Sequence, residues 1–201
     1  MNTSKKGAST LKLVELAILT ALIIVLQTTG TVIRIGTTPV SLVLIPIVVG
    51  ALLLGPGAGT FLGLVFGAVV YIAGATGADS FTFILFTDHP ILTALTCFGK
   101  GAAAGFLPGL LYRLLKQWND YAAVFIAAAA APIANTGLFI LGGLLMSGTL
   151  SANFVAEGST VIYFLIIGCA GINFLLEFAL NLIVAPAIHR IIVVVEKQLR
   201  H

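Results

Sequence analysis

Charged side chains are scarce in this sequence. Asp, Glu, Lys and Arg make up only 8% of its 201 residues, whereas 59% of the residues are hydrophobic. In a water-soluble domain about a quarter of the residues are charged, so this composition excludes a soluble globular domain, a disordered chain and a collagen-like chain. Both cysteines, Cys97 and Cys169, lie within apolar stretches, and this excludes a disulfide framework.

Signals for catalysis and metal binding are also missing. His89 is the only histidine away from the C-terminal region, and no His, Asp, Glu or Cys residues cluster at the spacing of metal ligands. The sequence has no Gly-x-Ser-x-Gly pattern, and Gly99-Lys100 lacks the Ser or Thr that completes a phosphate-binding loop. We therefore predict that the protein is not an enzyme, holds no metal or other cofactor and binds no nucleic acid. Any ATP-driven step needs separate subunits.

Long apolar segments fill most of the chain. A membrane-spanning helix needs about 20 apolar residues, and six such helices with short loops fit this length. The predicted spans are 11–29, 39–54, 58–75, 90–115, 121–146 and 160–188. The predicted fold class is therefore all-α: an integral membrane bundle of six transmembrane helices.

The positions of the few charges indicate the orientation of the bundle. If both termini are cytoplasmic, eight basic residues face inward and only Arg34 lies in an outer loop, as the positive-inside rule requires. We expect one transmembrane domain over 1–201 in a bacterial cell membrane, with cytoplasmic segments at 1–10 and 191–201. A signal peptide is the competing interpretation of the N-terminus, but no clear cleavage site follows the apolar run. The eight inward residues are Lys5, Lys6, Lys12, Arg113, Lys116, Arg190, Lys197 and Arg200.

Small residues recur at every fourth position in three of the predicted spans. Each pattern puts small side chains on one helix face, where another helix can approach closely. For the glycine rows we expect packing inside the bundle, whereas the alanine pair serves either such packing or the docking of a partner helix. The patterns are Ala17-x-x-x-Ala21, Gly59-x-x-x-Gly63-x-x-x-Gly67 and Gly101-x-x-x-Gly105-x-x-x-Gly109.

Polar residues within the spans are the candidates for a site, because a polar or charged group inside a membrane is costly unless it faces a partner or a cavity. Lys100 and Asn135 lie near the middle of their spans at about 1.5 Å per residue. Asn173, Glu177 and Asn181 follow at intervals of four residues, on one face of the last span. Two interpretations are open, and both can hold together. In the first, Lys100 and Glu177 form an ion pair and the amides join helices. In the second, Lys100, Asn135, Asn173 and Glu177 line a solute cavity in the outer half of the bundle. Glu177 and Asn181 lie deepest, and for these two a structural role is the alternative.

Two outer segments can contribute to such a cavity. The first, 28–39, is rich in hydroxyl groups and includes Arg34 and Thr37. It can fold over a ligand as a lid, with Arg34 neutralising an anion, although a solvated surface arginine is the alternative. The second, 79–90, is rich in phenylalanine. We expect it to anchor at the membrane interface, to form a re-entrant wall or to contact a ligand.

The chain resembles the substrate-binding membrane subunits, or S components, of energy-coupling factor vitamin transporters. The resemblance covers nearly the whole chain, including its length and its six expected spans. The segments that carry it are Ala17-x-x-x-Ala21, 39–42, 50–56, His89-Pro90-Ile91-Leu92 through Lys100-Gly101, and Pro132-Ile133-Ala134-Asn135-Thr136-Gly137.

The resemblance implies an importer in which this chain binds a vitamin and works with a transmembrane coupling subunit and two ATPase subunits. It implies that Ala17 and Ala21 lie on the surface that docks the coupling subunit. It also implies a vitamin site near the outer face, and Lys100, Asn135 and Asn173 lie at matching positions. Within the family the pattern is most similar to the riboflavin and pantothenate branch.

Of these two vitamins, the residues favour pantothenate. A flavin is expected to stack on aromatic side chains, yet the only tryptophan, Trp118, falls on the cytoplasmic side. The carboxylate of pantothenate can pair with Lys100 or Arg34, and its hydroxyl and amide groups suit Asn135 and Asn173. Threonines of the first outer loop, Thr37 among them, can serve the same groups.

Glu177 constrains this hypothesis, because a second buried carboxylate repels an acidic ligand unless it pairs with Lys100 or lies below the site. The alternatives are an S component for riboflavin, cobalamin, pyridoxine or a thiamine precursor, a small membrane enzyme or scaffold with a buried ion pair, and a stand-alone facilitator.

Overall fold

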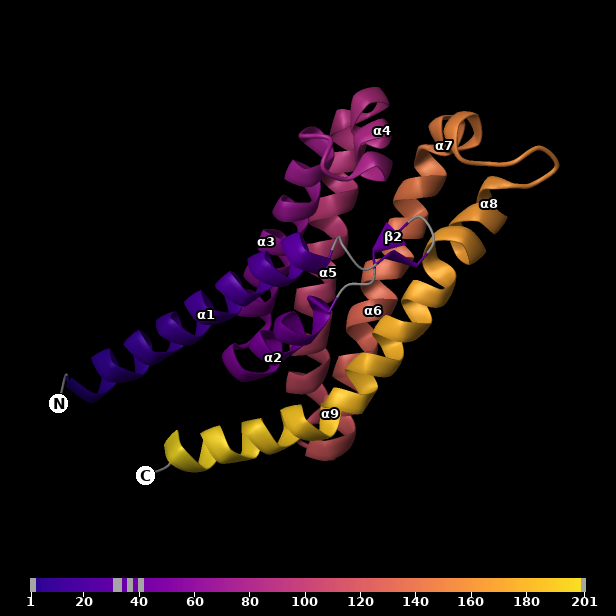
Figure 1. Ribbon diagram of the computed structural model, residues 1–201. Coiled ribbons are helices and arrows are strands. Elements are labelled where there is room, and N and C mark those ends of the chain that lie inside the picture. The colour runs from indigo at the N-terminus through magenta and orange to yellow at the C-terminus, as the bar shows by residue number, and fades with distance from the viewer. Residues whose placement is uncertain (1–2, 31–33, 36–37, 40–41, 200–201) are drawn as a thin grey trace.

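The structure is a computed structural model that describes the backbone at residues 3–30, 34–35, 38–39 and 42–199, and the side chains at 10–30 and 42–195. The elements of the described chain are helices, joined by turns and loops, and two short paired strands (Figure 1), so the all-α prediction is confirmed. In chain order the elements are α1 (Thr3–Gly30), β1 (Arg34–Ile35), β2 (Thr38–Pro39), α2 (Leu44–Leu54), α3 (Pro56–Ala75), α4 (Ser80–Asp88), α5 (Pro90–Leu115), α6 (Asp120–Leu145), α7 (Ser147–Asn153), α8 (Val161–Tyr163), the π-helix η1 (Phe164–Gly171) and α9 (Ile172–Leu199).

Five helical segments of the described chain are long and apolar enough to cross a membrane: Thr10–Gly30, α3, α5, α6 and the run Val161–Val195 through α8, η1 and α9. The predicted span at 90–115 matches α5 at both ends. The predicted span at 39–54 differs, because its helix α2 begins at Leu44 and has 11 residues. Such a helix is about 16 Å long, whereas the hydrocarbon core is about 30 Å thick. The count of six full-length spans is therefore not confirmed.

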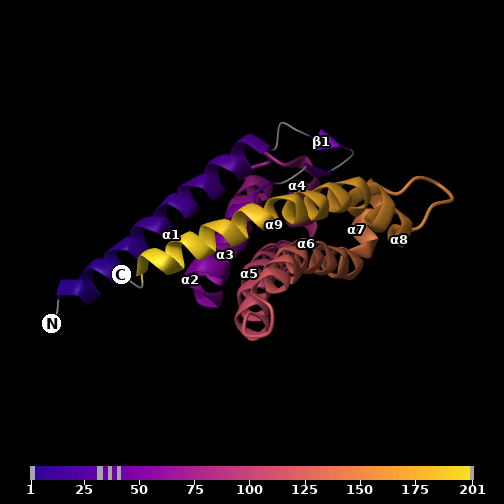
Figure 2. The same cartoon turned by 90° about the horizontal axis from the view of Figure 1, so that it is seen from below.

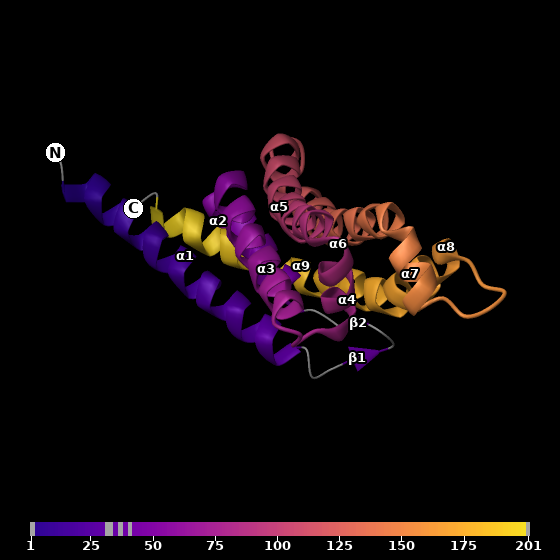
Figure 3. The ribbon, with the colours of Figure 1, turned by 90° about the horizontal axis from the view of Figure 1, so that it is seen from above.

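The long helices follow one another as neighbours in the order α1, α3, α5, α6 and α9. The two chain ends lie at one end of the bundle, together with the turn between α5 and α6, and we call this the terminal end. Helices α4 and α7 lie at the opposite end, the cap end (Figure 1). Views from below and from above show the first part of α1 and the last part of α9 extending past α5 and α6 on the same side (Figures 2 and 3).

A sharp corner at the terminal end connects α2 to α3. Gly55 forms it with φ +99°, a backbone conformation that residues with a Cβ rarely adopt. Pro56 then opens α3 at a position where its missing N–H leaves no hydrogen bond unmade. Because α2 is short and ends at this corner, it fills only the terminal half of the bundle.

The glycine rows of α3 and α5 pack against each other, as the sequence predicts. A Cβ added at Gly63 would overlap the carbonyl oxygen of Gly101, and one added at Gly101 would overlap that of Gly63. Gly59 and Gly105 are related in the same reciprocal way. The two backbones therefore touch at two positions about one helical turn apart, and this close contact fixes α5 and the side chains that it carries.

Buried apolar side chains form three clusters along the described bundle. The first joins α2, α6 and α9 toward the terminal end, the second surrounds α2 and α3, and the third lies under α4 and α7. We call the third the cap cluster; its buried members are Phe81, Leu85, Met146, Leu150, Leu165 and Cys169.

Two helices of the cap end, α4 and α7, were not predicted. Segment 79–90, expected as an outer loop, contains α4, whose first turn is capped by the Asp79 carboxylate accepting from Thr82 N at 3.1 Å. Helix α7 occupies Ser147–Asn153, where a turn was expected. The last span was predicted as one helix, but it begins with α8 and continues through the π-helix η1, Phe164–Gly171, into α9. Wide turns of this kind are rare and are frequently found at functional sites.

Candidate functional site

A cavity of about 110 Å³ lies between the long helices in the cap half of the described bundle. A single water needs roughly 10–15 Å³ of such space, so the cavity can hold a larger molecule. Its wall is contributed by α1, α3, α4, α5, α6, η1 and α9. The lining residues are Gln27, Phe66, Val70, Ala73, Asp79, Phe81, Thr82, Lys100, Asn135, Thr136, Phe139, Cys169, Ala170, Asn173, Phe174 and Glu177.

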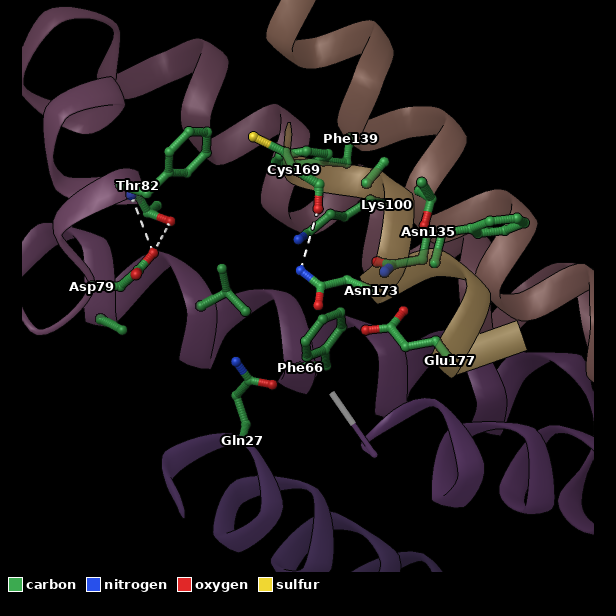
Figure 4. A pocket seen from close by; sticks show the side chains of 16 residues that line it. Gln27, Phe66, Asp79, Thr82, Lys100, Asn135, Phe139, Cys169, Asn173 and Glu177 are labelled. Atoms are coloured by element: carbon green, nitrogen blue, oxygen red, sulfur yellow. Dashed lines mark hydrogen bonds between the residues drawn. The ribbon is translucent and has the colours of Figure 1, made fainter. Parts of the chain in front are cut away.

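Four of the candidate site residues line this one cavity: Lys100 of α5, Asn135 of α6, and Asn173 and Glu177 of α9. Figure 4 shows their side chains gathered at one side of it. Asn135, Asn173 and Glu177 are each less than 9% exposed. Polar groups that are costly inside a membrane thus come together from three different helices.

The ammonium group of Lys100 lies among aromatic rings. Its Nζ is 5.4 Å from the ring centroid of Phe66 on α3 and 5.5 Å from that of Phe139 on α6. Both distances are within the range of a cation–π interaction. The structure does not show the alternative of a Lys100–Glu177 ion pair, because among the described side chains no ion pair joins these two residues. The ammonium instead contacts the rings of Phe66 and Phe139 on the two flanking helices.

Asn135 presents a hydrogen-bond acceptor to the cavity. The side chain is 8% exposed, and its Oδ1 accepts no hydrogen bond from the described residues. A buried acceptor of this kind costs free energy until a donor reaches it. A ligand hydroxyl or amide N–H would supply that donor.

Of the three polar residues spaced four apart on the last span, two line the cavity and one does not. Asn173 lines the cavity, and its Nδ2 donates to the carbonyl oxygen of Cys169 at 3.3 Å. Cys169 lies in η1, so this bond links the π-helix to the start of α9. Asn181 does not line the cavity; its Nδ2 donates to the backbone oxygen of Glu177 at 2.8 Å. The face shared by Asn173, Glu177 and Asn181 therefore reaches the cavity only with its first two members.

Several lining residues were not among the sequence candidates. Asp79 and Thr82 face the cavity from the cap end, where the Asp79 carboxylate accepts from both the N–H and the hydroxyl of Thr82 (Figure 4). Gln27, a polar residue near the end of α1, is 8% exposed and also lines the cavity. Its position within the first predicted span was an available signal. Phe66 and Phe139 gave none, because a phenylalanine in a span is equally consistent with ordinary packing.

The predicted lid residues lie outside this description. Thr37 is not among the described residues, and of Arg34 only the backbone in β1 is described, paired with Pro39 of β2. Their proposed contacts with a ligand stay predictions.

The alanine pair of α1 lies on the surface. Ala17 and Ala21 are both exposed, and they share a face with exposed apolar residues such as Leu13 and Ile24. The opposite face, which includes Ile23, packs into the bundle. Of the candidate spans, that of α1 has the smallest share of buried residues, so a broad apolar face of this helix is open to lipid or to a partner.

Comparison with known proteins identifies the class. The family of ECF transporter substrate-specific components matches this chain over residues 11–189. The chain belongs to this family. The resemblance deduced from the sequence is thereby confirmed, and the S component is a transporter subunit and not an enzyme. It is also similar to the pantothenic acid transporter PanT of Lactococcus lactis subsp. cremoris (strain MG1363), with 28% identity over 142 residues that cover 67% of this chain and 72% of that protein.

The cavity is the candidate site for the transported solute. An S component binds the transported solute, and the cavity is the place in the described bundle where buried polar side chains from several helices face a common space. No group of three or more His, Cys, Asp and Glu residues in the described part of the chain is arranged to hold a metal ion. The lining combines one ammonium, two carboxylates, several amides and aromatic faces, and sites for small organic molecules are typically built from such groups.

Proposed function

We propose that this S component binds pantothenate in the cavity and delivers it to the cell by docking on a coupling subunit with two ATPase subunits. The observation that carries the substrate assignment is the position of Lys100, whose ammonium lies at the cavity between Phe66 and Phe139 and not in an ion pair with Glu177. A carboxylate is the ligand group that suits such a site. The similarity to a pantothenic acid transporter supports the same choice.

The other polar groups of pantothenate have partners in the proposed site. Its amide N–H or a hydroxyl donates to Asn135 Oδ1, which has no donor among the described residues. Glu177 repels a carboxylate, so the acid of the ligand lies at Lys100 and its hydroxyl groups lie toward Glu177, which accepts from them. Asn173 supplies a further amide on the same side. Arg34 and Thr37 complete the site from the first outer loop.

We infer the orientation from the charges. Arg113 and Lys116 lie at the end of α5, at the terminal end of the bundle, and Lys12 and Arg190 belong to the two helices that extend there. By the positive-inside rule this end faces the cytoplasm and the cap end faces outward. The cavity then lies in the outer half of the membrane, where solute from outside reaches it first.

Docking on the coupling subunit uses the exposed face of α1. Small side chains at Ala17 and Ala21 let a second helix approach within close van der Waals contact, which is the usual basis of helix association in lipid. Because the opposite face of α1 holds the buried Ile23, the docking face can be covered without opening the bundle.

Mass spectrometry of small molecules retained by the gently purified protein tests the substrate directly. Pantothenate should be recovered at close to one molecule per chain from wild type and be lost from Lys100→Met. Recovery of a different vitamin in the same amount would refute the assignment while leaving the class intact.

A stand-alone facilitator is the rival mechanism. Uptake of labelled pantothenate into cells deleted for the ATPase subunits distinguishes the two, since the proposed mechanism requires that uptake stop. Continued uptake at the wild-type rate would favour the facilitator.

A further inference from the structure

The ammonium of Lys100 is held by uncharged groups. Phe66 and Phe139 come from α3 and α6, the two helices that flank α5, and their ring centroids lie 5.4 and 5.5 Å from Nζ. Aromatic faces attract a cation through their quadrupole and carry no negative charge. They can therefore fix the position of the ammonium without neutralising it.

A lysine in this place needs such restraint. Its four-carbon side chain is flexible, and a lysine within a membrane tends to extend toward the nearest water. Two rings on opposite neighbours favour the single direction in which the ammonium faces the cavity. A carboxylate in their place would hold the lysine as firmly but would compete with an acidic ligand for its charge.

The two rings are themselves fixed. Phe66 is 3% exposed and belongs to the buried cluster around α2 and α3. Phe139 packs against Phe81 of the cap cluster, with ring centroids 6.0 Å apart. The glycine contact between α3 and α5 holds the backbone of Phe66 close to that of Lys100. The position of the ammonium is thus set by the packing of three helices.

We propose that Phe66 and Phe139 are positioning residues that hold Lys100 for the carboxylate of the ligand and so give the site its preference for an acid over the corresponding alcohol. This proposal rests on the proposed function, in that the ligand is taken to be an acid bound at Lys100.

The test compares two probes, pantothenate and pantothenol, in which a hydroxymethyl group replaces the carboxylate. The quantity measured by calorimetry is the ratio of the Kd for pantothenol to the Kd for pantothenate. Phe139→Leu and Phe66→Leu should each lower this ratio about tenfold, which corresponds to about 1.4 kcal/mol, with little change in the affinity for pantothenol. Phe139→Tyr keeps an aromatic face and should keep the ratio.

Phe174→Leu is the matched control. Phe174 also lines the cavity, but its ring contact is with Phe178 and not with Lys100. This variant should change both affinities by the same factor and leave the ratio as in wild type. If the leucine variants at 66 and 139 also weaken both probes equally, the rings only shape the cavity and the proposal is overturned.

A measurement without ligand separates this proposal from the identity of the substrate. In protein labelled with ¹³C at lysine Cε, the Lys100 signal, assigned by its loss in Lys100→Met, should be shifted upfield by the two rings. Phe139→Leu should reduce that shift. If wild type does not bind pantothenate but its Lys100 signal is shifted, the substrate assignment is refuted and the positioning of Lys100 by the two rings still holds. An unshifted signal in wild type would overturn the positioning whichever ligand binds.

Discussion

Gly63 of α3 and Gly101 of α5 lie so close together that neither position has room for a side chain. A Cβ at either residue would overlap the other's carbonyl oxygen. This backbone contact joins the helix that carries Phe66 to the helix that carries Lys100, so the packing of small residues determines the geometry of the cavity.

Replacing Gly63 should therefore damage the whole bundle. Overpacking of a tight interior typically costs about 1–3 kcal/mol, and the obstacle here is backbone, which cannot move aside like a flexible side chain. We expect Gly63→Val to lower the melting temperature in detergent by several degrees or to prevent folding. The control is Gly99→Ala, because Gly99 is exposed and an added Cβ meets no atom within 4 Å. Equal melting temperatures for the two variants would show that the contact is looser than described.

Asn135 and Asn181 offer a test that separates binding from stability. Each has a buried Oδ1 that accepts no hydrogen bond from the described residues, but only Asn135 lines the cavity. Replacing Asn135 by Leu removes an unsatisfied acceptor, so the ligand-free protein should be as stable as wild type or more stable. Pantothenate binding should weaken about 10- to 100-fold, as expected for a lost buried hydrogen bond.

Asn181→Leu is the companion variant for that experiment. Its affinity for pantothenate, measured by calorimetry, should stay within about threefold of wild type. If Asn181→Leu weakens binding as much as Asn135→Leu, the effect is a general disturbance of the bundle and Asn135 does not face the ligand.

Lys100 should matter for binding in a way that a basic residue at the terminal end does not. The variant Lys100→Met lacks the cation and should bind pantothenate about 10- to 100-fold more weakly, because a hydrogen bond to a charged group contributes about 1.5–3 kcal/mol. Arg113→Met removes an exposed cation at the far end of α5 and should leave the affinity unchanged. Similar affinities for the two variants would exclude Lys100 from the site.

Docking should depend on Ala17 and not on the cavity. Ala17→Trp puts a large side chain on the exposed face of α1, where a partner helix is expected to approach. The variant should bind pantothenate like wild type but fail to copurify with the coupling and ATPase subunits. Ile91→Trp changes an apolar side chain on α5 that is 75% exposed, and its complex should remain intact. Copurification of Ala17→Trp at the wild-type level would remove the role assigned to this face.

The hydrogen bonds of Asp120 at the terminal end should contribute to the stability of the bundle and not to ligand binding. The hydroxyl of Tyr112 donates to Asp120 Oδ1 at 2.7 Å, and Nε2 of His189 lies 2.9 Å from Asp120 Oδ2. Asp120 thereby connects α5, α6 and α9. Asp120→Ala should lower the free energy of unfolding by about 1–2 kcal/mol, measured by denaturation in mixed micelles, with pantothenate affinity preserved in the protein that remains folded. A large loss of affinity would mean that the terminal end is coupled to the cavity.

The long helices could be predicted because hydropathy alone defines them. The bounds of α5 follow from Pro90 at its first position and from the charged residues after Leu115. Hydropathy does not show where a helix begins inside an apolar run, and for this reason α2 was predicted to start at residue 39. Helix α4 was missed although Asp79, followed three residues later by Thr82, is an N-cap signal. The π-helix η1 has no comparable sequence signal.

The cavity could be predicted only in part, and the reason is physical. Polar residues are rare within the spans, so each one is a candidate for the site. Four of these candidates line the cavity: Lys100, Asn135, Asn173 and Glu177. Their partners cannot be deduced from one helix at a time. The contact of Lys100 with Phe66 and Phe139 depends on how α3, α5 and α6 pack, and the sequence left an ion pair with Glu177 open as an alternative.

Calorimetric titration of pantothenate into the purified wild-type protein tests the central proposal most directly. We predict saturable binding of one pantothenate per chain, and competition that is strong with other acids of similar shape and weak with riboflavin. No heat of binding with pantothenate, together with saturable binding of riboflavin or another vitamin to the same preparation, would contradict the proposal.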